Sequence, residues 1–218
     1  MYILFILVNN PNSNILLKEY NMSLLKDSRT KENLMRAFAG ESQARNRYTF
    51  GESLAKKQNL YVVQKVFNYT AEQEKAHAWV FYNHLKELSG SSITIDAGYP
   101  VEVYDDLIKT LKDSQHNEYE EWDKVYKEFA KTAREEGFLE VANSFEKISE
   151  IEKIHGDRFG RFASDLENNT LFKKDTEEKW ICLNCGHVHT GTKAPMACPV
   201  CSYPQGYFIL YSNSPFEN

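Results

Sequence analysis

The sequence predicts a mainly α-helical protein, in which a four-helix bundle precedes a small C-terminal module of short strands and turns. Three observations support this fold class. A single proline, Pro100, interrupts the region between Thr30 and Thr176, whose composition is otherwise that of long helices. The motif Glu-x-x-His occurs twice, with the two copies 78 residues apart. All four cysteines follow this region, among prolines and glycines typical of short strands and turns.

Four helices are predicted, and they pair into two hairpins. We expect them to span residues 31–59, 62–88, 103–136 and 139–173. Ser28 or Thr30 is the expected cap of the first helix, and Gly137 marks a tight turn between the third and fourth. Residues 91–100 contain β-branched residues, a glycine and the proline, so they are expected to form an extended crossover. Two hairpins joined by one long connection are a known topology of four-helix bundles.

The two hairpins look like copies of each other. Glu74-x-x-His77 and Glu152-x-x-His155 match at an offset of 78 residues. At the same offset, five further positions are identical: Tyr48 and Tyr126, Ala55 and Ala133, Val63 and Val141, Phe67 and Phe145, and Phe81 and Phe159. These identities recur every three or four residues, which is the spacing of one helix face. A duplicated helix hairpin therefore explains the pattern, with the apolar pairs as ordinary core positions.

The two Glu-x-x-His motifs predict a site for two metal ions. Residues three apart lie on one face of a helix, so each motif directs a carboxylate and an imidazole to one place. Charged residues are rarely buried without a partner, and metal ions would provide one. The other two helices should then supply carboxylates. The candidates are Glu41 and Glu52 on the first helix, and Glu118, Glu120, Glu121 and Glu128 on the third. Glu41 has small neighbours that permit close helix packing, whereas Glu118 and Glu121 share a face.

The cysteines form two knuckles that predict a second metal site. Cys182-x-x-Cys185 and Cys198-x-x-Cys201 are separated by 12 residues, and four thiolates at this spacing bind one tetrahedral metal. The module, at residues 177–213, is too small to fold on an apolar core alone. The spacing does not choose between zinc and iron. On these residues alone a structural zinc is favoured, whereas an iron site would transfer electrons.

Composition limits the other function classes. The chain has 218 residues and a formal net charge of −5, which does not suggest a nucleic-acid partner. Its longest apolar run, Tyr2 to Val8, has seven residues, far short of the roughly 20 that span a membrane. No basic residue precedes that run and no small-residue cleavage site follows it, so a signal peptide is not indicated. Residues 1–21 are expected to be an N-terminal extension outside the fold: either the true start is Met22, or the segment targets or anchors the chain.

At this point a family resemblance can be stated. Five stretches resemble motifs of the rubrerythrins: Ala37–Tyr48 in the first helix, Thr70–His77 in the second, Glu118–Gly137 in the third, Glu152–His155 in the fourth, and Trp180–Cys201 in the C-terminal module. The resemblance covers about residues 22–211. It implies a ferritin-like four-helix bundle at residues 22–174 that carries a di-iron site. It also implies a rubredoxin-like β/knuckle domain at residues 177–213 that carries one iron on Cys182, Cys185, Cys198 and Cys201, which reverses the preference for zinc.

The resemblance also assigns roles to residues. It implies that the di-iron ligands are Glu41, Glu74, His77, Glu118, Glu121, Glu152 and His155. Glu74 and Glu152 would bridge the irons, and His77 would take up one iron on reduction. Tyr48 and Tyr126 would hydrogen-bond to ligand carboxylates and orient them. The catalytic residues would be Glu41, Glu74, His77, Glu121, Tyr48 and Tyr126.

The third helix departs from the family pattern. His116-Asn117 stands where the family usually has Ala-Gly, and Trp122 replaces a tyrosine. Gln115 and Glu118 are therefore an alternative ligand pair. We prefer Glu118 and Glu121, because an ungapped count back from Tyr126 places them at the motif positions.

The function that the resemblance implies is reduction of hydrogen peroxide to water, as a defence against oxidative stress. An external donor, such as a rubredoxin or its reductase, would supply electrons through the four-cysteine iron. A homodimer or larger homo-oligomer is implied, with no membrane or nucleic-acid partner. Thiolate ligands indicate a reducing cytoplasm. Two other classes remain as alternatives: iron storage, which needs no dedicated electron donor, and a structural zinc-binding interaction protein.

Overall fold

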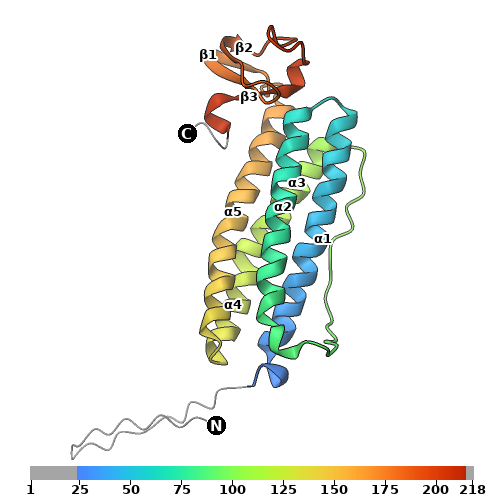
Figure 1. Cartoon of the computed structure of the whole chain (residues 1–218), viewed down its shortest axis with the longest axis vertical. Helices are drawn as coiled ribbons and strands as arrows, with labels where there is room; N and C mark the ends of the chain where they lie inside the picture. The colour runs from blue at the N-terminus through green and yellow to red at the C-terminus, as the bar shows by residue number, and fades with distance from the viewer. Residues whose placement is uncertain (1–23, 215–218) are drawn as a thin grey trace, which may run out of the picture.

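The computed structural model describes residues 24–214, so the predicted extension at residues 1–21 lies outside the described part of the chain. An elongated helical bundle carries a small sheet at one end (Figure 1). The helices are α1 (Arg29–Lys57), α2 (Tyr61–His84), α3 (Leu107–Glu120), α4 (Tyr126–Glu135) and α5 (Leu139–Glu167). A π-helical segment, Glu121–Val125, joins α3 to α4, so residues 107–135 form the third rod of the bundle. The mainly α fold with four long helical rods confirms the prediction.

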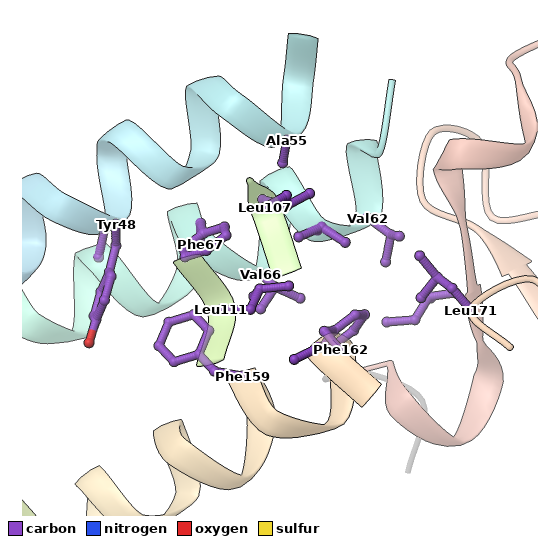
Figure 2. Close-up of a cluster of buried hydrophobic side chains, with 14 of the residues drawn as sticks. Tyr48, Ala55, Val62, Val66, Phe67, Leu107, Leu111, Phe159, Phe162 and Leu171 are labelled. Carbon is purple, nitrogen blue, oxygen red and sulfur yellow. The ribbon is translucent and has the colours of Figure 1, made fainter. Parts of the chain in front are cut away.

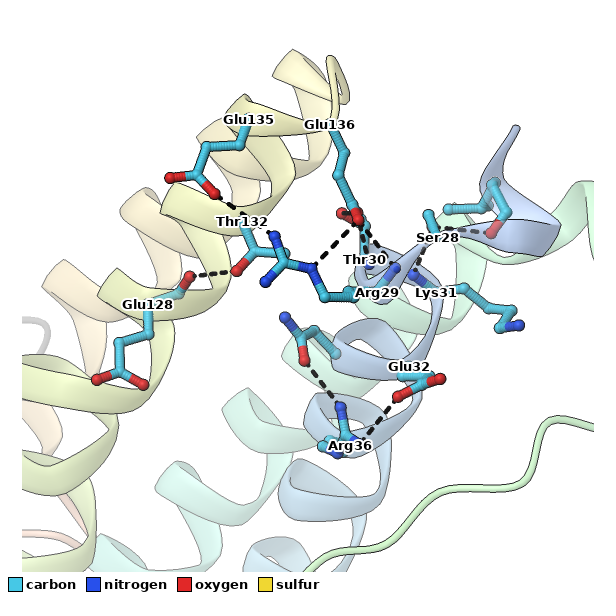
Figure 3. A network of polar contacts seen from close by, with 12 residues as sticks. Ser28, Arg29, Thr30, Lys31, Glu32, Arg36, Glu128, Thr132, Glu135 and Glu136 are labelled. Atoms are coloured by element: carbon cyan, nitrogen blue, oxygen red, sulfur yellow. Dashed lines mark hydrogen bonds and ion pairs between the residues drawn. The ribbon is translucent and has the colours of Figure 1, made fainter. Parts of the chain in front are cut away.

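The start of α1 is fixed from two directions (Figure 3). Ser28 is the N-cap residue, and its hydroxyl accepts a hydrogen bond from the backbone N–H of Lys31. The carboxylate of Glu136, at the end of α4, accepts bonds from the backbone N–H groups of Arg29 and Thr30 and from the Thr30 hydroxyl. The first N–H groups of a helix have no partner within the helix. This distant glutamate therefore satisfies two of them and ties the third rod to the first.

The connection from α2 to α3 is a long crossover, defined here as residues 89–106. It runs alongside the bundle next to α1 (Figure 1). Between residues 92 and 105 it makes no backbone–backbone hydrogen bond in the described structure, so side chains hold it in place. Helix α3 begins at Leu107 rather than at residue 103, because Asp106 acts as the N-cap and accepts from the N–H of Lys109.

Helix α5 ends at Glu167, six residues before the predicted end. Asn169 adopts a φ of 57°, and the backbone N–H of Thr170 turns back to the carbonyl of Asp165. The Thr170 hydroxyl donates to the Asp165 side chain and reinforces the turn. Residues from Lys173 onward then enter the first strand. Side-chain capping of this kind is local chemistry that helical periodicity does not register.

The C-terminal module is a three-stranded antiparallel sheet in the order β2-β1-β3. Its strands are β1 (Lys173–Cys182), β2 (Val188–Lys193) and β3 (Phe208–Leu210). Trp180 pairs with His189 on one side and Leu210 on the other, and it is fully buried with Phe208. The module sits on the end of the bundle where α5 ends and α2 begins (Figure 1).

The contact between module and bundle is close. The ring of Tyr207 stacks on that of Tyr61, the first residue of α2, with centroids 4.3 Å apart. A Cβ atom on Gly206 would lie 1.9 Å from the carbonyl oxygen of Asn59 in the α1–α2 turn. Only a glycine lets the two backbones approach this closely.

The bundle interior contains two apolar clusters that repeat each other. In the first, which Figure 2 shows, the rings of Tyr48, Phe67 and Phe159 pack with centroids 4.8–6.2 Å apart. In the second, the repeat-related rings of Tyr126, Phe145 and Phe81 pack with centroids 4.8–5.7 Å apart. The 78-residue repeat therefore corresponds to an approximate two-fold arrangement of the bundle. The polar site described below lies between the two clusters.

None of the described helices combines the length and the apolar composition that a membrane crossing needs.

Candidate metal centres

The two repeated glutamates each face both repeated histidines. Glu74 places one carboxylate oxygen 3.1 Å from Nδ1 of His77 and the other 2.8 Å from Nδ1 of His155. Glu152 does the same, with its oxygens 3.0 Å and 2.9 Å from those two nitrogens. Ligand atoms of all four residues lie within 4.8 Å of one another. Two carboxylates that each offer one oxygen to each of two imidazoles have the arrangement of bridging ligands between two metal positions.

Glu41 and Glu118 complete the two ends of this cluster. Glu41 has an oxygen 3.8 Å from Nδ1 of His77, and Glu118 has one 3.8 Å from Nδ1 of His155. Each end therefore holds one histidine and one further carboxylate. All six side chains are buried, with relative exposures of 0–7%.

Two tyrosines hold the end carboxylates. Tyr126 donates its hydroxyl hydrogen bond to Glu41 at 2.5 Å, and Tyr48 donates to Glu118. Burial, and next the charge of Glu118, raises the pKa of Tyr48 well above 10.0. Burial, and next the charge of Glu121, does the same for Tyr126. Both phenols therefore stay protonated and act as donors to these carboxylates, and their role in orienting ligands stays a prediction.

The cluster has the unsatisfied donor set that a metal site requires. Both oxygens of Glu152, one oxygen each of Glu41, Glu74 and Glu118, and both ring nitrogens of His155 are buried and have no hydrogen-bond partner. The short distances between these atoms are therefore not hydrogen bonds, because their geometry does not meet the angles that a hydrogen bond requires. Two ligand atoms about 2.1 Å from one metal ion at a right angle are about 3.0 Å apart. The spacing of these atoms and their convergence thus fit two metal ions held by carboxylate and imidazole.

The charges in the cluster perturb one another strongly. Burial opposes the charged imidazole, but the carboxylates of Glu74, Glu118 and Glu152 outweigh it and raise the pKa of His155 to about 12. Burial, and then the charge of Glu74, raises the pKa of Glu118 to about 8. Burying carboxylates together is unfavourable without compensating positive charge. Metal cations would supply that charge and release the protons.

Glu121, the seventh predicted ligand, lies at the margin of the cluster. It begins the π-helical segment and is half-buried. Its pKa is raised well above 4.5, by burial and next by the charges of Glu118, Glu152 and Glu74. Gln115, the alternative candidate, points elsewhere: its side chain lies against Gly160 of α5 and donates to the hydroxyl of Tyr119.

The remaining carboxylates considered from the sequence are not brought to the site. Glu52 accepts from Gln64 and Asn68 on the surface, Glu120 pairs with Lys124, and Glu128 is exposed. They are solvated side chains. The ligand roles of the seven residues that remain stay a prediction, with the geometry as support.

The four cysteines also converge. Sγ of Cys182 lies 3.8 Å from that of Cys201, and Sγ of Cys185 lies 3.6 Å from that of Cys198. A disulfide would need about 2.05 Å, whereas four sulfurs about 2.3 Å from a central metal are about 3.8 Å apart. Each knuckle closes with the same turn: the N–H of Gly186 donates to the carbonyl of Cys182, and that of Ser202 donates to the carbonyl of Cys198. The module therefore has the geometry of a tetrahedral thiolate site.

Several polar residues near the helical cluster were not singled out from the sequence. Arg47 forms an ion pair with Glu102 of the crossover at 2.8 Å, and the Asn117 amide donates to both oxygens of the same carboxylate. Arg158, one turn beyond His155, donates to Thr70 and Gln73 on α2. An arginine in a chain with 26% charged residues has no distinguishing pattern, so only the fold could find these residues.

The fold and the two centres define a class. A ferritin-like bundle with a buried Glu/His site of the di-iron type, joined to a four-cysteine iron site of the rubredoxin type, defines a di-iron carboxylate protein with a rubredoxin-like module. Residues 32–163 match the family profile "Rubrerythrin", and residues 180–209 match "Rubrerythrin, rubredoxin-like domain". The chain belongs to the rubrerythrin family.

Individual relatives agree with this assignment. The chain is 43% identical to a rubrerythrin of Clostridium perfringens over 88% of its own length and 100% of that protein. It is 41% identical to a rubrerythrin of Nitratidesulfovibrio vulgaris over 87% and 97%. Among solved structures, nigerythrin in a mixed-valence state aligns with a TM-score of 0.57 and 24% identity over 94% of this chain and 100% of that chain. A bacterioferritin from Desulfovibrio desulfuricans, described as having a diiron site, aligns with a TM-score of 0.58 and 24% identity over 65% and 81%. The last two show the shared fold.

Proposed function

We propose that this protein is a non-haem di-iron peroxidase that reduces hydrogen peroxide to water and so protects the cell from oxidative stress. The reaction takes up two electrons and two protons, breaks the O–O bond and releases two water molecules. The observation that carries the proposal is the pairing, in one chain, of a two-histidine cluster bridged by Glu74 and Glu152 with a four-cysteine module. The first can hold two irons and the second can return electrons to them.

The bundle residues would act as follows. Glu74 and Glu152 would bridge the irons, with Glu41 and His77 at one end, Glu118 and His155 at the other, and Glu121 beside them. When bound, a carboxylate-bridged iron pair supplies one electron from each ion to a two-electron acceptor. Tyr48 and Tyr126 hold the outer carboxylates at fixed positions through their hydroxyl groups. The apolar clusters on both sides exclude bulk water from these groups.

The four-cysteine module would be the point where electrons arrive. Cys182 and Cys198 are buried, whereas Cys185 is exposed and Cys201 half-exposed, so one side of the site faces outward. Burial opposes the Cys201 thiolate, but the backbone N–H of Tyr203 helps to lower the pKa of this thiol to about 6. A small redox protein such as a rubredoxin, or its reductase, would donate here. The thiolates suit a reducing cytoplasm, and a homodimer or larger homo-oligomer would bring modules and bundles together.

The proposal is tested by peroxide consumption with an electron-donating reductase under anaerobic conditions. The purified chain should be red, contain about three irons, and turn over hydrogen peroxide. Cys182→Ser should stop steady turnover, while the chemically reduced bundle still consumes one equivalent of peroxide. Steady turnover in Cys182→Ser would mean that the module is structural and that the proposed electron route is wrong.

Iron storage is the competing function of a ferritin-like bundle. It would appear as uptake of many ferrous ions per chain, with oxidation by dioxygen. The attached four-cysteine module favours peroxide reduction, because storage requires no dedicated donor. A colourless chain that binds only zinc would exclude both functions.

A further inference from the structure

A cavity connects the crossover to the edge of the helical cluster. It has a volume of about 320 Å³ and lies between residues 97–100 of the crossover and the inner faces of α1 and the third rod. Glu121 lines it, and so do Arg47, Asn117 and Tyr126. Tyr126 donates its hydroxyl to Glu41, so the cavity reaches a residue that contacts the buried carboxylate cluster.

Gly40 keeps this cavity open. A Cβ atom at Gly40 would lie 3.7 Å from Oε1 of Glu121 and 3.8 Å from the ring of Tyr99. The space between the crossover and the carboxylate is therefore about one methyl group wide at this point. A small hydroperoxide fits such a passage, and a side chain of leucine size would fill it.

The crossover that covers the cavity is held by few contacts. Tyr99 donates its hydroxyl to the carbonyl of Arg36, and the Arg36 guanidinium donates to the carbonyl of Asp96. The strongest contact is at Glu102, which accepts from Arg47 at 2.8 Å and from Asn117 at 2.9 and 3.0 Å. Charge-assisted bonds between half-buried partners are stronger than neutral ones.

The side chain of Asn117 reaches the crossover from the third rod, and that of Arg47 reaches it from α1. Arg47 and Asn117 also line the cavity. The residues that hold Glu102 therefore also form part of the wall of the passage.

We infer that this cavity is the substrate entrance to the carboxylate cluster, and that Glu102, held by Arg47 and Asn117, limits the size of the hydroperoxide admitted. Glu102 is a positioning residue: it fixes the crossover and does not touch the reacting atoms. The inference rests on the proposed peroxidase function for its substrate class, although the passage itself is defined by the residues that line it.

The role of Glu102 in limiting substrate size is tested on the metal-loaded full chain with the variants Glu102→Ala and Asn117→Ala. Both should speed proteolytic cleavage within residues 92–105. They should raise the ratio of kcat/KM for cumene hydroperoxide to that for hydrogen peroxide by about tenfold, the lower end of shape discrimination by a pocket. Glu146→Ala, which breaks a bidentate pair with Arg134 on the surface, should change neither quantity. An unchanged ratio overturns the role of Glu102 in limiting substrate size, whether or not cleavage is faster.

The passage is tested without turnover, by the rate at which azide changes the visible spectrum of the oxidised protein. Gly40→Leu should slow this rate at least about tenfold, whereas Thr49→Leu, an exposed change on the same helix, should not. Ala97→Trp narrows the passage from the crossover side and serves if Gly40→Leu does not fold. Glu102→Ala should speed azide binding. Unaltered azide rates in Gly40→Leu and Ala97→Trp would overturn the assignment of this cavity as the substrate entrance. A wild type that reduces no hydroperoxide would refute the proposed function, and the azide rates would still decide the entrance.

Discussion

Glu118 and Tyr126 are eight residues apart on the third rod, one more than the seven that separate Glu41 from Tyr48 on α1. Nevertheless the two tyrosines reach opposite carboxylates in equivalent ways, Tyr126 to Glu41 and Tyr48 to Glu118. The π-helical segment Glu121–Val125 lies between Glu118 and Tyr126 and takes up the additional residue. A single-turn π-bulge of this kind often marks a functional site. Here it preserves the two-fold arrangement and places Glu121 beside the cluster.

The π segment depends on a hydrogen bond from Ser149, which leads to our first prediction. Wider helical turns disturb the regular backbone ladder, and the hydroxyl of Ser149 on α5 donates to the carbonyl of Trp122 at 2.8 Å. Ser149→Ala should therefore lower the free energy of unfolding by about 0.5–1.5 kcal/mol, because a part-buried carbonyl loses its side-chain partner. Chemical denaturation measures this. Ser53→Ala on the exposed face of α1 is the control and should change stability little; equal effects would refute the role.

The bridging glutamates give the second prediction. Glu74→Ala or Glu152→Ala removes a carboxylate that faces both histidines, so the variant should lose peroxide turnover. The four-cysteine iron and its colour should stay, since that site is built from separate residues of the terminal module. Metal analysis and the visible spectrum check both points. Simultaneous loss of the red colour would show that the two centres are not independent.

The 78-residue internal repeat decides how much of this site could be predicted from the sequence. A duplicated motif marks both members, so Glu74, His77, Glu152 and His155 could be found together, and the paired tyrosines with them. Glu102 could not be found, because its partners Arg47 and Asn117 meet it only after the crossover has folded back. Nothing in the local sequence separates such a glutamate from solvated ones. The π segment leaves one trace in the sequence, the eight residues from Glu118 to Tyr126 against the seven from Glu41 to Tyr48. That difference indicates an additional residue only once the two tyrosines are seen to reach equivalent carboxylates.

The fold was predicted to a similar depth. Long helices, the turn at Gly137 and the position of the crossover agree with the structure, and the glycine has a positive φ of 89°. The end of α5 was wrong by six residues, because the turn at Asn169 and Thr170 depends on side-chain hydrogen bonds rather than on periodicity. The docking of the module on the bundle had no sequence pattern at all.

That docking gives the third prediction. Gly206→Ala would place a methyl group 1.9 Å from the Asn59 carbonyl, so one backbone must move. We expect a stability loss of about 1–3 kcal/mol, as in other overpacked sites, and faster hydrogen exchange around residues 57–61. Gly98→Ala, where no atom lies within 4 Å of the new methyl group, is the stability control. A wild-type exchange pattern in Gly206→Ala would mean that the module is not held against the bundle here.

The fourth prediction concerns pH and the cap formed by Glu136. Burial favours the neutral acid, but hydrogen bonds from Thr30 and then from Arg29 outweigh it and lower the pKa of Glu136 below 4.5. The folded state then holds this proton less tightly than the unfolded state. The stabilisation is therefore complete above about pH 4.5 and is lost as the pH falls through the lowered folded pKa.

Glu136→Gln should accordingly lower the free energy of unfolding by about 1 kcal/mol at pH 7, and the difference from wild type should shrink at pH 3. Glu128→Gln, an exposed change on the same helix, should show no such pH-dependent difference. Denaturation curves at the two pH values decide it. A difference that is equal at both would assign the effect to something other than the ionised cap.

The last prediction separates the two ligand pairs considered for the third rod. Glu121 faces the negative cluster from the start of the π segment, whereas Gln115 lies against Gly160 and Tyr119. An amide is also a weaker ligand than a carboxylate for ferric iron.

Glu121→Ala should retain two irons in the bundle but lose reactivity with peroxide, because the ligand nearest the entrance is missing. Gln115→Ala should match wild type in iron content and in peroxide reactivity. Stopped-flow spectroscopy of the reduced proteins, with metal analysis of each, measures both quantities. A bundle without iron in Gln115→Ala, together with a fully reactive Glu121→Ala, would show that the ligand register of the third rod is shifted and that the pair is Gln115 and Glu118.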